Sequence, residues 1–137
     1  MKNLEKFSQV VLRVGIGLVI IWFGVSQIGD PSSWVSFLPS FMNKLPISEI
    51  NFVYLNGWFE LLAGIMLISG FYTRIVSFLL CLHLFGIIFS LGYNAVAVRD
   101  FGIFMALVSI FLDKENRYSL DEFLERRKVG ESYGTPR

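Results

Sequence analysis

The stretch FSQVVLRVGIGLVIIWFGVSQ, Phe7 to Gln27, decides the fold class of this chain. It holds 21 residues, and Arg13 is the only charged one among them. About 20 apolar residues in a helix, at a rise of about 1.5 Å each, cross a hydrocarbon layer about 30 Å thick. The run exceeds the apolar core of a signal peptide, which is about 7 to 15 residues long, and no small-residue cleavage site follows it. The sequence therefore predicts a membrane-spanning helix that stays attached.

Three further apolar runs of similar length follow. They are 52–71, interrupted only by Glu60, then the uncharged 75–91, and 93–112, which contains the adjacent pair Arg99 and Asp100. Four such runs leave too little polar sequence to cover a water-soluble core. We therefore expect an all-α fold, a bundle of four transmembrane helices at 7–27, 52–71, 75–91 and 93–112.

The composition of the 137 residues agrees with a membrane protein. Hydrophobic residues make up 54% and charged residues 17%, whereas soluble domains carry about 25% charged residues. The net charge of +1 gives no basic surface of the kind that binds nucleic acid. Because the chain has one cysteine, Cys81, and one histidine, His83, we expect neither an internal disulfide nor a metal site.

The distribution of Lys and Arg predicts the orientation. Ten of the twelve lie at the N-terminus, in the turn near Arg74 or in the C-terminal tail, whereas Lys44 and Arg99 lie on the other side. Cytoplasmic segments of membrane proteins carry the excess of basic residues. We therefore expect a multi-pass protein of the cell membrane with both termini in the cytoplasm and the long loop 29–51 outside.

Two segments outside the spans have helical patterns of their own. Pro31-Ser32-Ser33 is typical of a helix start, and the apolar residues after it, beginning with Trp34, predict an interfacial segment in the outer loop. Ser119 to Glu122 is a capping box, and Leu120, Phe123 and Leu124 form an apolar stripe. The tail is therefore expected to form a short amphipathic cytoplasmic helix.

Ionisable residues inside the spans are the candidate functional groups, because a charge in hydrocarbon is costly. Counted along helices, Glu60 lies about 12 Å below the outer surface and Arg99 and Asp100 about 9 to 10 Å below it. These depths predict a polar cluster in the outer half of the bundle, with Glu60 and Arg99 as an ion pair. The expected members are Gln27, Asn56, Glu60, His83, Arg99 and Asp100.

Two interpretations of this cluster stay open at the level of sequence. In one, Glu60 and Arg99 lock the second span to the fourth and bind no ligand. In the other, the cluster lines an outward-opening cleft for a small polar headgroup, such as a quinone ring or an oxyanion. His83 likewise either bonds to a neighbouring helix or serves as a quinone contact or a proton relay. Arg13, close to the inner surface, is expected to extend its side chain to the lipid headgroups.

Small residues recur on the first three spans. Gly17 and Gly24 lie on the first, Gly57 and Gly64 on the second, and Gly86 on the third. Residues without bulky side chains let two helices approach closely. The glycine-bearing faces could pair helices within the chain or join two copies in a homodimer, and the sequence does not decide which.

Five motifs together resemble the DoxX family of small four-helix membrane proteins, over residues 8–124. In chain order they are Arg13-Val14-Gly15-Ile16-Gly17, Gly24-Val25-Ser26-Gln27, Asn56-Gly57-Trp58-Phe59-Glu60, Gly70-Phe71-Tyr72-Thr73-Arg74 and Arg117-Tyr118-Ser119-Leu120-Asp121. The resemblance implies a four-helix transmembrane domain over 1–117 and a cytoplasmic helix and tail over 118–137. It marks Arg13, Glu60, Arg74 and Asp121 as family-like positions and implies no catalytic residue set.

The resemblance also implies two functions of different classes. The family is named for membrane subunits of a thiosulfate:quinone oxidoreductase, which implies a subunit of a quinone-linked redox complex. Such a subunit would bind quinone while a partner subunit supplies the electron carrier, since the chain has no recognisable flavin, haem or metal motif. The alternative is a non-enzymatic assembly or scaffold protein in which Glu60 and Arg99 are purely structural. Whether the chain is itself an enzyme stays open.

Overall fold

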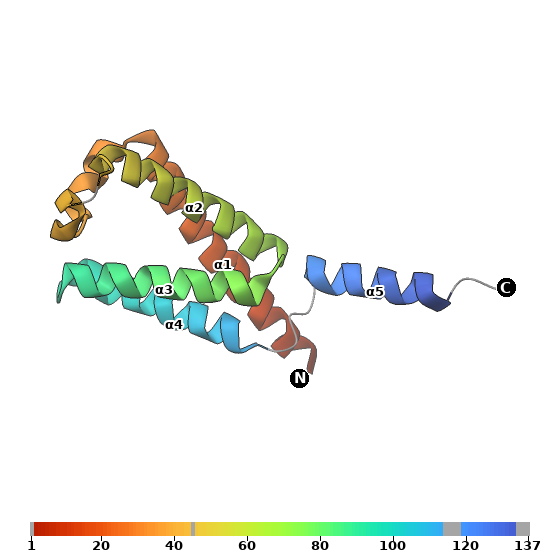
Figure 1. Ribbon diagram of the computed structural model, residues 1–137. Helices are drawn as coiled ribbons and strands as arrows, with labels where there is room; N and C mark the ends of the chain where they lie inside the picture. The colour runs from red at the N-terminus through yellow and green to blue at the C-terminus, as the bar shows by residue number, and fades with distance from the viewer. Residues whose placement is uncertain (1, 45, 114–118, 134–137) are drawn as a thin grey trace.

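The computed structural model describes residues 2–44, 46–113 and 119–133, and every regular element in these ranges is a helix. The elements are α1 (Lys2–Gly29), η1 (Pro31–Phe37), η2 (Ser40–Lys44), α2 (Glu49–Ser69), α3 (Thr73–Leu91), α4 (Ala95–Leu112) and α5 (Leu120–Tyr133), as Figure 1 shows. The helices α1 to α4 are each long and apolar enough to cross a membrane. The predicted all-α fold with four membrane-spanning helices is confirmed.

Two helices begin at other residues than the apolar runs predicted, because polar residues cap their first turns. Helix α2 begins at Glu49 rather than 52, because the hydroxyl of Ser48 accepts a hydrogen bond from the Asn51 amide at 3.3 Å. Helix α4 begins at Ala95 rather than 93, because the Asn94 side chain accepts from the Ala97 amide at 2.9 Å. Such caps satisfy amides that have no partner inside the helix.

Glycines bring α1 and α2 into direct backbone contact. A Cβ atom added at Gly24 would lie 2.6 Å from the amide nitrogen of Leu61 and 2.7 Å from the carbonyl oxygen of Gly57. One added at Gly64 would lie 2.9 Å from the carbonyl oxygen of Gly17. The glycine faces therefore pack within the chain, and on α1 and α2 they are not available to a second copy.

The four spans form two pairs, α1 with α2 and α3 with α4. Figure 1 shows the pairs meeting near the turn between α2 and α3 and separating toward the opposite end, where η1 and η2 lie. We call the end with Gly70 to Thr73 the turn end, and the end with η1 and η2 the loop end. A core that includes Leu67, Leu80 and Leu107, all fully buried, joins the pairs.

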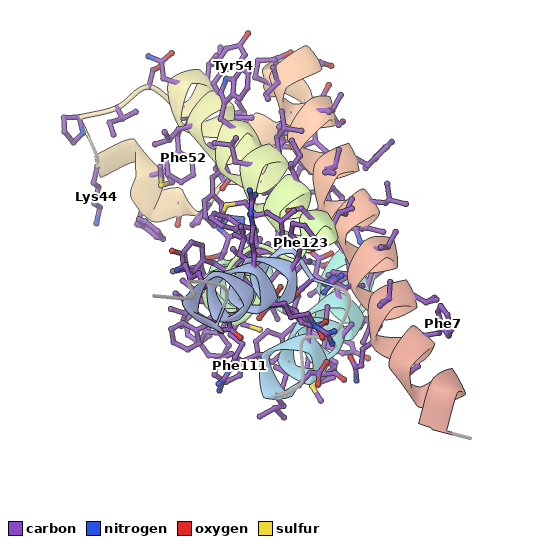
Figure 2. The ribbon with its side chains drawn as sticks, turned by 90° about the vertical axis from the view of Figure 1, so that its right-hand side faces the viewer. Phe7, Lys44, Phe52, Tyr54, Phe111 and Phe123 are labelled. Carbon is purple, nitrogen blue, oxygen red and sulfur yellow. The ribbon has the colours of Figure 1, made fainter. Side chains whose placement is uncertain are left out.

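Apolar side chains also cover the outside of the bundle. Phe7 projects away from α1 in Figure 2 and is 58% exposed, and large hydrophobic residues such as Leu62 and Phe85 are exposed on other spans. An exposed apolar surface of this extent on every span is what a lipid environment requires. The fold is that of a bundle in a bilayer.

Helix α5 extends away from the bundle beyond the turn end (Figure 1). It begins with the predicted cap, in which the Glu122 amide donates to the Ser119 hydroxyl at 3.1 Å. The predicted helix is therefore present, and Phe123 on it is 65% exposed. The domain boundary expected at 117–118 lies outside the described residues, as do Arg117 and Tyr118 of the last motif.

Candidate functional site

A cavity of about 650 Å³ lies at the loop end, between the two separated helix pairs. Its walls come from all four spans and from η1 and η2. The six candidate ligand-binding residues predicted from the sequence all line it: Gln27, Asn56, Glu60, His83, Arg99 and Asp100. The structure thus brings together in one cavity polar groups from four different helices.

Glu60 is the centre of a hydrogen-bond network in this cavity. The Gln27 side-chain amide donates to Glu60 Oε2 at 2.7 Å, and that of Asn56 donates to Glu60 Oε1 at 3.2 Å. Asn56 also donates to Gln27 Oε1 at 2.7 Å, so the two amides and the carboxylate form a closed triangle between α1 and α2. Glu60 is only 4% exposed, which makes these donors essential for holding a carboxylate there.

His83 adds a partner from α3. Its Nε2 lies 3.0 Å from Glu60 Oε1, and its ring stands edge-on to Phe59 with the centroids 5.3 Å apart. Because an ionised carboxylate only accepts hydrogen bonds, pairing with it places a proton on Nε2. The imidazole is partly exposed, with 20% of its side chain accessible, so it borders the cavity rather than the packed core.

The predicted ion pair between Glu60 and Arg99 is wrong. Arg99 instead binds its neighbour Asp100, with Nη2 at 2.8 Å and Nε at 2.9 Å from Asp100 Oδ1. Its guanidinium also lies 5.0 Å from the centre of the Phe23 ring, within the range of a cation–π contact. Depth counting gave the right level, but the nearer carboxylate on α4 takes the guanidinium, and neutral donors and His83 satisfy Glu60.

The rest of the cavity wall is mainly aromatic and aliphatic. Phe23 of α1, Trp34 and Phe37 of η1, and Phe52 of α2 line it, and Figure 2 shows Phe52 beside the η2 segment. The sequence indicated an apolar outer segment after Pro31 but did not place it over the polar cluster. The resulting site combines hydrogen-bonding groups from all four spans with flat apolar surfaces.

Three of the four family-like positions lie elsewhere, at the turn end. Arg13 is 5% exposed, so the expectation that it reaches the lipid headgroups is wrong. Gly70 packs over it, since a Cβ there would lie 2.9 Å from Arg13 Nη1, and Asp113 and Asp121 interact electrostatically with its guanidinium. Arg74 lies at the start of α3. Only Glu60 of the four lines the loop-end cavity.

Comparison with protein families covers the first four of the five motifs, and the motif at 117–121 lies beyond the matched residues. The DoxX family model matches residues 8–92, more than half of the chain. The chain belongs to the DoxX family. The matched region contains the glycine-packed pair α1 and α2 together with α3, and hence Gln27, Asn56, Glu60 and His83. No curated protein and no solved structure matches this DoxX-family chain. The family and the four spans make it a multi-pass membrane protein.

Proposed function

We propose that this DoxX-family protein binds the headgroup of a quinone or quinol in the loop-end cavity, as the small membrane subunit of a quinone-linked oxidoreductase complex. The observation that carries the proposal is the composition of the cavity wall. A cluster containing Glu60, His83 and Arg99 faces a space otherwise lined largely by aromatic and aliphatic side chains. A quinone has the matching form, a flat apolar ring with hydrogen-bonding oxygens at its edge.

The charges in the cavity favour a neutral headgroup over an oxyanion. Glu60 and Asp100 contribute two negative charges and Arg99 one positive charge, so the wall carries a formal charge of −1 when His83 is neutral. Arg99 is also already paired with Asp100. An oxyanion would meet net repulsion in a medium of low dielectric constant. A quinone carbonyl can accept from Arg99, and a quinol hydroxyl can donate to a carboxylate.

The cavity is open to a ligand that arrives from the lipid phase. Phe89 lines it and is 83% exposed, and Phe37 and Phe41 also line it and are exposed. Because these side chains both line the cavity and are exposed on the outside of the bundle, the cavity opens onto the apolar surface of the protein. The isoprenoid chain of a quinone could therefore stay among the lipid acyl chains while the ring occupies the cavity.

Binding can be measured with Trp34 as the reporter, because Trp34 lines the cavity. The variant Trp22→Phe/Trp58→Phe leaves Trp34 as the only tryptophan of the three. Titration of the detergent-purified protein with decylubiquinone and with a menaquinone analogue should quench Trp34 fluorescence saturably. In a titration with decylubiquinol, the reduced form, Glu60→Gln should bind about tenfold more weakly than the parent, as expected for the loss of one charge-assisted contact from a quinol hydroxyl.

The matched control is Glu49→Gln, which removes an acid from the first turn of the same helix, outside the cavity. It should bind like the parent protein. Linear, unsaturable quenching by both quinones, or equal affinity for the quinol in Glu60→Gln and the parent, would overturn the proposal.

A partner-docking role is the second candidate, and helix α5 favours it. Leu120 and Phe123 are exposed on a helix that extends beyond the bundle, and exposed apolar side chains on a projecting helix are typical of interaction surfaces. Deletion of Leu120 to Glu131 should then abolish co-purification of a partner subunit and leave quinone quenching of Trp34 unchanged. If a partner subunit still co-purifies with the deletion variant, α5 does not have this docking role.

A further inference from the structure

Another cavity, of about 620 Å³, lies at the turn end and shares no lining residue with the loop-end cavity. Its walls are the start of α3, the end of α4 and the first turns of α5. Because α3 begins at Thr73 and α4 ends at Leu112, this groove lies where the spans leave the hydrocarbon. A ligand in it would be at the level of the lipid headgroups.

The part of the groove nearest the spans is apolar. Ile75 and Phe78 of α3 line it together with Phe111 of α4, and the rings of Phe78 and Phe111 lie 5.6 Å apart. Ile75 and Phe78 are exposed on the outside of the bundle. These side chains offer acyl chains a surface continuous with the groove.

At the start of α3 the groove has groups that suit a phosphate. Arg74 lines it, with its guanidinium 5.6 Å from the centre of the Phe111 ring. Thr73 also lines it, is 3% exposed, and has a buried hydroxyl with no hydrogen-bond partner among the described residues. The capping residue Tyr72 provides no side-chain bond to the first amides of the helix. A helix start, a guanidinium and an unpaired hydroxyl favour a phosphate at this point of the groove. The groove as a whole has an excess of negative charge, from Asp121, Glu122 and Glu125, so it suits a zwitterion rather than a free anion.

The opposite wall, on α5, is acidic. Glu122 accepts from Arg126 at 2.7 Å, and Asp121 interacts electrostatically with Arg13. Glu125 lines the groove too, and within the described part of the chain it has no ion pair. One carboxylate therefore faces the groove with its charge available to a cation.

We propose that this groove binds a phospholipid with a primary ammonium headgroup, phosphatidylethanolamine. The phosphate lies at Thr73 and Arg74, the ammonium at Glu125, and the acyl chains lie along Ile75 and Phe78. Phosphatidylglycerol lacks the cation for Glu125. Phosphatidylcholine has the charge but no N–H group to donate to a carboxylate. The proposal does not depend on quinone binding.

The test is native mass spectrometry of the protein after exchange into micelles with equimolar phosphatidylethanolamine, phosphatidylcholine and phosphatidylglycerol. The parent protein should retain phosphatidylethanolamine preferentially. Arg74→Gln should lower its retention about tenfold, the effect of losing one charge-assisted contact to the phosphate, and Arg74→Lys should restore much of it. Glu125→Gln should make the retention of phosphatidylethanolamine and phosphatidylcholine equal.

The controls lie at the other end of the molecule, where Lys44→Gln and Glu49→Gln remove one cation and one acid. Both should retain lipid like the parent. Soluble glycerophosphoethanolamine should not displace the lipid, because it lacks the acyl chains. Equal retention of the three lipids by the parent, unchanged retention in Arg74→Gln and Glu125→Gln, or full displacement by the soluble headgroup would each overturn the proposal. Quinone quenching of Trp34 should be unaffected in every variant, which separates this test from that of the proposed function.

Discussion

The two ends of the bundle place an ionisable side chain in a buried position by different means. At the turn end, Arg13 interacts with Asp113 and Asp121, and Gly70 and the start of α5 pack over it. At the loop end, Glu60 accepts from neutral side chains and His83, and the site faces a cavity. The first arrangement is closed and joins segments of the chain, whereas the second leaves room for a ligand. A buried charge is therefore informative about function only together with the space beside it.

The largest expected effect is on the free energy of unfolding, and it distinguishes Arg13 from Glu60. Arg13→Met leaves Asp113 and Asp121 without their buried cation and should destabilise the fold by about 3 kcal/mol, since both carboxylates that remain are partly exposed. Glu60→Gln, which keeps an acceptor oxygen in the network, should cost less stability but weaken quinol binding. Thermal unfolding in detergent and the Trp34 titration measure the two effects. If Arg13→Met weakens quinone binding but leaves the unfolding temperature unchanged, Arg13 does not have the purely structural role assigned to the turn end.

The glycine contact between α1 and α2 should give the next largest effect. Gly24→Ala places a methyl group 2.6 Å from a backbone nitrogen that cannot move away alone, and such overpacking costs about 1–3 kcal/mol. Gly15→Ala on the same helix meets nothing within 4 Å and should stabilise by up to about 1 kcal/mol through helix propensity. Unfolding temperatures of the two variants should shift in opposite directions. Equal shifts would show that the helices do not touch at Gly24.

Two glycines with positive φ allow a smaller comparison between the ends. Gly70 at the turn end has φ 74° and ψ 28°, a left-handed conformation that costs alanine about 1–2 kcal/mol. Gly92 at the loop end has φ 66° and ψ −161°, a region adopted essentially by glycine alone, where alanine costs about 1–3 kcal/mol. At Gly70 the added methyl would also lie 2.6 Å from Ser119 Cβ, whereas at Gly92 it meets nothing within 4 Å. Gly92→Ala should therefore lose stability through backbone strain alone, whereas Gly70→Ala should also displace Ser119 and increase protease cleavage near α5. Unchanged cleavage near α5 in Gly70→Ala would argue that α5 is not anchored at Gly70.

The smallest effect concerns pH at the loop end. Hydrogen bonds from the hydroxyls of Ser32 and Ser33 lower the pKa of the exposed Asp30 below its usual 3.8. A lowered pKa gives a contribution that is present above pH 3.8 and is lost as the pH falls through the lower folded value. Trp34 in the adjacent η1 should show a fluorescence transition below pH 3.8. Asp30→Asn should lack this transition, and its persistence there would assign it to another group.

The sequence predicted the number of spans and the members of the loop-end cluster, but not their pairing. Runs without charge reveal spans because the cost of charge in hydrocarbon is large and local. Counting at a fixed rise gave Glu60 and Arg99 a common depth, but it carries no information on the direction each side chain takes around its helix. Arg13 was misplaced because its surroundings, Gly70 and Ser119, are far away in sequence. The position of η1 and η2 along the cavity was missed for the same reason, because the residues that they pack against are distant in sequence.

The hydrogen bonds of Glu60 also bear on how the protein is made. Gln27 and Asn56 belong to α1 and α2, and the glycine contacts between these helices need no other part of the chain. During synthesis, the first hairpin can therefore enter the bilayer with two of the three donors to its acid already in place. The second hairpin then supplies His83 and completes the cavity, so the cavity forms only after all four spans have entered the bilayer.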